Sequence, residues 1–67
     1  MIQVIDVKQV RQSLNLTQEQ FANRFNFTLS TLRQWEQGRR APPRSTTVLL
    51  KVIAFAPEVV ERALRVA

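Results

Sequence analysis

The stretch that most constrains the fold runs from Thr17 to Gly38 and reads TQEQFANRFNFTLSTLRQWEQG. It contains two segments with helical signals, and between Phe25 and Thr28 there is room only for a turn. Apolar residues lie on both sides of this turn, so the two helices must cross steeply and bury the joint between them. We therefore expect a helical motif against which the rest of the chain packs.

Repeated capping signals mark the ends of the first three helices. Each begins at a Ser/Thr/Asp-type cap, and the first two caps have a Gln three residues later, which is the capping-box spacing. Each ends at a residue that tolerates a positive φ. The caps are Asp6, Thr17 and Thr28, the stops are Asn15, Asn26 and Gly38, and the second and third helices are predicted at 18–25 and 29–37.

The remaining segments complete a five-helix pattern. Residues 39–44 form a basic, proline-stiffened loop, because proline removes a donor and biases its predecessor to extended geometry. Ser45 is predicted to cap a fourth helix that runs to about Ala56, and Pro57 suits the first turn of a fifth. Residues 2–5 fit either an edge strand or an ordered arm, and four residues do not decide between them.

The predicted fold class is therefore all-α, a compact five-helix domain with a central helix-turn-helix. Residues 1–67 form one domain, with an N-terminal arm at 1–5 and a candidate dimerisation region in the last two helices, at 45–66. The aromatic residues of the motif are assigned to the core rather than to base stacking, since they fall at its interior positions. The interior set is Phe21, Ala22, Phe25, Phe27, Leu32 and Trp35.

Composition restricts the chemistry available to the chain. A domain of 67 residues gains little net stability from one core, yet it has no Cys and no His for a disulfide or metal staple. Its five carboxylates are scattered and no Gly-rich phosphate loop is present, so enzymatic function is disfavoured and no cofactor or metal is expected. Subunit association is the expected source of extra stability.

Charge and hydropathy indicate the compartment and the partner. Ten Lys and Arg residues against five acids give a formal net charge of +5, which favours an anionic partner, although a basic surface can also serve solubility alone. No apolar run is long enough to span a bilayer, and the first residues do not match a signal peptide. We expect a cytoplasmic protein that is not associated with a membrane.

The stretch LTQEQFANRFNFTLSTLRQWEQGRR resembles the helix-turn-helix of the phage-repressor and Cro class. One difference is Asn26, which stands at the turn position where glycine is commonest. Asparagine can adopt the turn geometry at a small cost in free energy. The tail, Gly-Arg-Arg-x-Pro followed by LLKVIAFAPEVVERAL, looks like bacterial HigA-type antitoxins, and the resemblance covers Val7 to Leu64. The matching positions are Leu16, Thr17, Gln18, Glu19, Ala22, Thr28, Leu32, Trp35, Glu36 and Gly38.

This resemblance implies roles for individual residues. The exposed first turns of the third helix are expected to read base edges, with a solvated helix face as the alternative. Its flanks are expected to contact phosphates, with capping alone as the alternative role for Thr17. The base-reading candidates are Leu29, Ser30, Thr31, Arg33 and Gln34, and the phosphate candidates are Gln18, Thr17, Thr28, Arg39, Arg40 and Arg44.

The last two helices carry more apolar residues than one small monomer can readily cover. We expect some of this surface, mainly on the fifth helix, to pair with a second copy, so that two recognition helices enter successive major grooves about 34 Å apart on a palindrome. The alternative is that these residues fill the monomer core. The dimerisation candidates are Val59, Val60, Ala63, Leu64 and Val66.

The leading hypothesis from the sequence is a DNA-binding repressor that acts as a homodimer on double-stranded operator DNA and is the antitoxin of a toxin–antitoxin pair. The alternative is a protein-interaction module that neutralises a toxin or docks another protein, with DNA binding secondary. RNA binding is disfavoured because the chain lacks the expected aromatic sheet or a matching motif.

Overall fold

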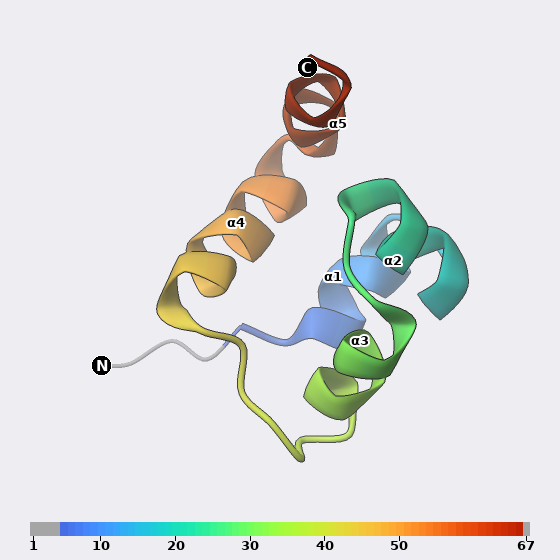
Figure 1. Ribbon diagram of the computed structural model, residues 1–67, viewed down its shortest axis with the longest axis vertical. Coiled ribbons are helices and arrows are strands. Elements are labelled where there is room, and N and C mark those ends of the chain that lie inside the picture. Colours follow the sequence, from blue (N-terminus) through green and yellow to red (C-terminus); the bar gives the residue numbers. More distant parts are fainter. Residues whose placement is uncertain (1–4, 67) are drawn as a thin grey trace.

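The computed structural model describes residues 5–66, and within this range the chain forms five helices and no strand. The helices pack around one core, with α1 to α3 on one side of the molecule and α4 and α5 on the other (Figure 1). The all-α prediction is therefore confirmed, whereas the question of an arm or strand at residues 1–4 lies outside the described residues. The helices are α1 (Val7–Ser13), α2 (Gln18–Phe25), α3 (Leu29–Glu36), α4 (Arg44–Phe55) and α5 (Pro57–Arg65).

The three predicted cap residues are confirmed, and of the two predicted capping boxes the one at Thr17 is reciprocal, whereas Asp6 forms only the cap itself. The Asp6 carboxylate accepts from the backbone N–H of Gln9 at 3.1 Å, and Thr17 and Gln20 form a reciprocal capping box. The Thr28 hydroxyl accepts from the N–H of Thr31 at 3.2 Å. Each cap satisfies a backbone donor that has no partner inside its helix.

The three predicted left-handed residues are also confirmed, with φ values of 58° at Asn15, 62° at Asn26 and 74° at Gly38. Asn26 directs the chain out of α2 and into the short turn before α3, and it does so without a glycine. A Cβ at Gly38 would meet no atom within 4 Å, so its positive φ, and not crowding, is what favours glycine there.

Two local predictions require correction. Ser45 does not cap α4: the helix begins at Arg44, two residues before the start at Thr46 that a cap at Ser45 implies, and it has no side-chain cap. The reason is that Pro43, in extended conformation, itself accepts the first helical hydrogen bond, from the N–H of Thr47 at 2.9 Å. Helix α3 ends at Glu36, one residue before the predicted end at Gln37. Pro57 occupies the first turn of α5 as predicted.

The centre of the core is formed by side chains of α2, α3 and α4. The largest fully buried side chains are Phe21, Leu32, Leu50 and Ile53. An aromatic series extends this core to the end of α3, because Phe21 contacts Phe27 with ring centroids 6.1 Å apart and Phe27 meets Trp35 edge-on at 5.3 Å. Aromatic contacts of this geometry add to the stabilisation from burial, so the joint between α2 and α3 is rigid.

One of the five residues predicted to form the dimer contact is buried within the monomer. Val60 is only 6% exposed and belongs to the core, so it is not available to pair with a second copy as the sequence suggested. Its side chain points inward because it lies on the α5 face that packs against α2 and α4. Other large apolar side chains remain exposed in the monomer; these are Val48, Val52, Phe55, Val59, Leu64 and Val66.

Candidate nucleic-acid interface

One face of α3 is polar and accessible. Ser30 and Arg33 are exposed, and Leu29 and Gln34 are half-buried, whereas Leu32 on the opposite face is fully buried. The helical repeat accounts for this division, because residues three and four apart share a face. The structure therefore places these four base-reading candidates on one accessible surface.

Thr28 and Thr31 are engaged with each other at the start of α3. Besides capping the N–H of Thr31, the Thr28 hydroxyl donates to the Thr31 hydroxyl at 2.7 Å. Thr31 is half-buried. These two side chains thus help to fix the first turn of the helix, and Thr31 presents less of its surface than Ser30 does.

The beginning of α2 lies beside this face. The side-chain oxygen of Gln18 accepts from Nε of Arg33 at 3.5 Å, while its Nε2 donates to Oε1 of Glu36 at 3.2 Å. Because the Gln18 amide is used within the protein, the groups left for an anion are the backbone N–H donors of the first helical turn. Thr17, at the same end of α2, is exposed.

Glu36 joins three helices. Its carboxylate accepts from Nε and Nη2 of Arg11 at 2.7 and 3.0 Å, in addition to Gln18. The side chains of Arg11 and Glu36 are 13% and 5% exposed, and Arg11 also donates to the carbonyl oxygen of Leu16 at 2.9 Å. A paired, bidentate contact of this kind is directional, so it fixes α3 relative to α1 and α2.

The hydrogen bond from Arg11 to Glu36 raises the pKa of the Arg11 guanidinium above its ordinary value; burial opposes this and the Coulomb attraction to Glu36 adds to it. A raised pKa for a cation means that its stabilising contribution is complete at low pH and is lost only as pH rises through the folded value. For arginine that value lies far above neutrality. Arg11 therefore remains charged throughout the neutral range.

Sequence reasoning did not assign a role to this ion pair, although it contained a signal. Arg11 lies on the helix face that also carries Val7, Val10 and Leu14, and a charge on an otherwise apolar face requires a buried partner. The partner lies 25 residues away in the sequence, which no local pattern specifies. Glu36 was recognised only as one of the positions that match the helix-turn-helix of the phage-repressor and Cro class.

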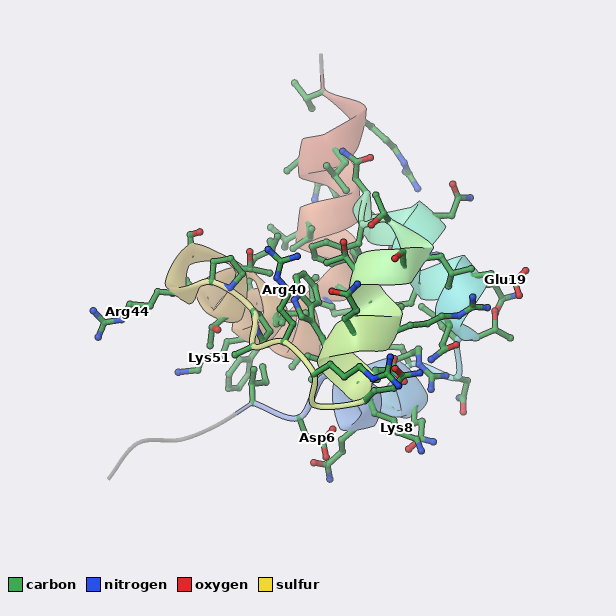
Figure 2. The ribbon with its side chains drawn as sticks, turned by 60° about the horizontal axis from the view of Figure 1, so that its bottom comes forward. Asp6, Lys8, Glu19, Arg40, Arg44 and Lys51 are labelled. Atoms are coloured by element: carbon green, nitrogen blue, oxygen red, sulfur yellow. The ribbon has the colours of Figure 1, made fainter. Side chains whose placement is uncertain are left out.

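The basic residues after α3 occupy two places. Arg39 and Arg40 are exposed in the turn that follows the helix, where the N–H of Arg39 donates to the carbonyl of Gln34 at 3.0 Å. Arg44 is exposed at the start of α4, and Figure 2 shows its side chain extending away from α3. Arg39 and Arg40 therefore adjoin the polar face directly, whereas Arg44 is separate from it.

The described residues contain no cluster of His, Cys, Asp or Glu suited to a metal ion. Across residues 5–66, no helix is long and apolar enough to cross a membrane.

A polar helix face, held across a tight turn beside the start of the preceding helix, defines a helix-turn-helix protein. The chain belongs to the HTH_3 helix-turn-helix family, whose model matches residues 7–50. The resemblance to the helix-turn-helix of the phage-repressor and Cro class is confirmed.

Known proteins similar to this chain include a solved structure and a curated antitoxin. The crystal structure of a HTH XRE-family like protein from Agrobacterium tumefaciens is 47% identical, with a TM-score of 0.85 over 90% of this chain and 97% of that one. Antitoxin HigA-2 of Vibrio cholerae serotype O1 is 32% identical over 53 residues, which are 79% of this chain and 51% of HigA-2. The chain thus spans about half the length of this curated relative.

Proposed function

We propose that the protein is a transcriptional repressor that binds a palindromic operator as a dimer in the cytoplasm, at the nucleoid. The observation that carries this proposal is the accessible face of α3, on which Ser30, Arg33 and Gln34 adjoin the start of α2. Side chains on the first turns of such a helix have the length and the donors to reach base edges in the major groove.

The surrounding groups suit contact with the DNA backbone. The first-turn N–H donors of α2 and the hydroxyl of Thr17 lie at the start of α2, Thr28 lies at the start of α3, and Arg39 and Arg40 follow the end of α3. Phosphate contacts fix the orientation of a protein on the duplex, whereas base contacts provide specificity. Arg44 is proposed as an additional phosphate contact from the start of α4.

The proposal is tested by selecting bound sequences from a random pool of duplex DNA. We expect a palindrome whose half-sites are about one helical turn apart, because a two-fold dimer reads the same bases twice. Enrichment of a single asymmetric half-site would contradict the dimeric part of the proposal, and no enrichment at all would contradict sequence-specific binding.

Arg33→Ala is expected to reduce discrimination by about 1 to 3 kcal/mol at one base-pair position, because a bidentate contact to one base is lost. Arg33→Lys should retain the charge but lose most of this discrimination, since ammonium lacks the planar fork of guanidinium. Arg62→Ala, which removes an exposed arginine of α5, is the matched control. Affinities for single-base operator variants measure the effect, and equal losses on specific and random duplexes would exclude base reading by Arg33.

Arg40→Ala is expected to weaken binding to all sequences alike and to reduce the slope of log affinity against log salt by about one phosphate contact. The reason is that an exposed arginine in the turn after α3 neutralises a phosphate without facing a base edge. Titrations at several salt concentrations measure this slope. A loss confined to one operator sequence would instead assign Arg40 to base reading.

The similarity to Antitoxin HigA-2 supports the further proposal that this regulator is the antitoxin of a toxin–antitoxin pair. Co-expression with the product of the neighbouring gene tests it: a toxin should lose its growth inhibition and copurify with this chain. Because that relative is about twice as long as the matched region, neutralisation by this chain alone is the critical measurement.

The dimer is proposed to form through apolar side chains of the last two helices. On α5, Val59, Leu64 and Val66 are 51%, 48% and 77% exposed, and Ala63 is also exposed. Exposed apolar residues gathered on neighbouring helices are typical of a surface that binds a partner.

A further inference from the structure

Helix α4 has a second apolar face that the monomer does not cover. Val48, Val52 and Phe55 are 61%, 38% and 91% exposed, whereas Leu50 and Ile53 on the inner face are fully buried. The three exposed residues follow one another at spacings of four and three, which places them in one row along the helix. Figure 1 shows α4 at the edge of the molecule, with α1 on its inner side.

A groove lies beside this row, between α4 and the beginning of α1. Its volume is about 480 Å³. For comparison, an apolar cavity of roughly 150 Å³ is sufficient to bind benzene, so the groove can admit an aromatic side chain. It is lined by Ile5, Asp6, Gln9, Val10, Lys51, Ala54 and Phe55.

We propose that a second copy of the chain covers this face, in a two-fold contact in which Phe55 of each copy enters the groove of the other. This inference rests on the proposed function, because it identifies the contact that forms the operator-binding dimer. It places that contact on α4, whereas the sequence had favoured α5.

The position of Phe55 supports a closed dimer. Phe55 both protrudes, at 91% exposure, and forms part of the groove wall. The projecting group and the hollow therefore belong to one patch, and a two-fold interface requires that the same patch serve on both copies. A projection far from its hollow would instead join copies head to tail into open chains.

The charges at the groove also match a second copy. Asp6 and Lys51 both line it, and in the described part of the chain neither forms an ion pair. Figure 2 shows both side chains on the outside of the molecule. In a two-fold contact, Asp6 of each copy can face Lys51 of the other, so the patch is complementary to itself in charge as well as in shape.

Sedimentation equilibrium from micromolar to millimolar protein, without DNA, tests the inference. The wild-type chain should dimerise, and Phe55→Ser should weaken dimerisation on the order of 30-fold, as loss of a central aromatic anchor does. Asn23→Ser, which changes an exposed and uncharged residue of α2 outside the groove, is the control and should change dimerisation by less than about threefold. A monomeric wild type, which would leave the groove for a different protein, or a Phe55→Ser dimer of unchanged affinity, would overturn the inference.

A charge test examines the pairing across the two-fold axis. Lys51→Glu should weaken dimerisation because it places like charges opposite each other, and adding Asp6→Asn should restore part of the loss. Asparagine is used because it still caps α1. Equal weakening in the single and double variants would overturn the pairing of Asp6 with Lys51. Far-ultraviolet circular dichroism verifies that each variant remains helical.

The failure of this inference is distinguishable from failure of the proposed function. Phe55→Ser should bind an isolated half-site with the wild-type base preference and lose only its cooperative binding to the complete palindrome. If the wild type shows no preference for any DNA sequence, the proposed function fails, and the dimer measured without DNA is a separate result. If palindrome binding stays cooperative in Phe55→Ser, the contact on α4 is excluded although the repressor function stands.

Discussion

Phe21→Ala is expected to lower the free energy of unfolding by about 4 kcal/mol, because it removes a large, fully buried side chain and leaves a cavity. Phe21 contacts Phe25 and Phe27, with ring centroids at 4.9 and 6.1 Å, at the joint between α2 and α3. A chain of this length has a total stability of roughly 3 to 10 kcal/mol. The substitution therefore unfolds a substantial fraction of the protein, and DNA binding falls with it.

Chemical denaturation followed by circular dichroism measures this change, and the chain provides a matched control. Phe55→Ala makes the same substitution at a side chain that is 91% exposed, so under conditions that keep the protein monomeric it should alter stability by no more than about 0.5 kcal/mol. Phe21→Leu should cost much less than Phe21→Ala because more of the buried volume is retained. Similar losses for Phe21→Ala and Phe55→Ala would contradict the placement of the core.

The parts of the fold that were predictable from sequence depend on short-range interactions. The cap at Thr17 and the left-handed residue at Asn26 are each specified by neighbours within a few positions, and both lie where expected. The error at Ser45 has the same local origin. Ser45 has a hydroxyl that could cap a helix. However, α4 begins before Ser45, because the carbonyl of Pro43 accepts the first helical hydrogen bond.

The parts that were not predictable depend on contacts between distant residues. Helix α4 is apolar nearly all round, so its sequence alone does not show that Ile53 is buried and Phe55 exposed. Val60 entered the core because α5 turns that face toward the rest of the domain. The base-reading face could be proposed from spacing and family resemblance, whereas the ion pair that holds α3 in place joins residues 25 positions apart.

Glu36→Ala is expected to lower the free energy of unfolding by about 3 kcal/mol, because it leaves Arg11 charged and without its partner in a largely buried position. The Arg24–Glu61 pair provides the comparison. Its closest approach is 3.5 Å and its side chains are 47% and 25% exposed, so Glu61→Ala should cost less than about 1 kcal/mol. Equal losses at the two sites, measured by chemical denaturation, would show that burial does not strengthen the inner pair.

Replacing both partners separates the stabilising role of this pair from its role at the interface. Arg11→Met combined with Glu36→Leu should recover most of the stability that Glu36→Ala loses, since apolar residues of similar size can replace a buried ion pair. The double variant nevertheless removes the acceptor of Gln18 Nε2, and Gln18 is the residue that contacts Arg33. We expect it to fold but to discriminate operator variants less well at the position assigned to Arg33. Unchanged discrimination would show that Glu36 serves stability alone and that packing is sufficient to orient the recognition face.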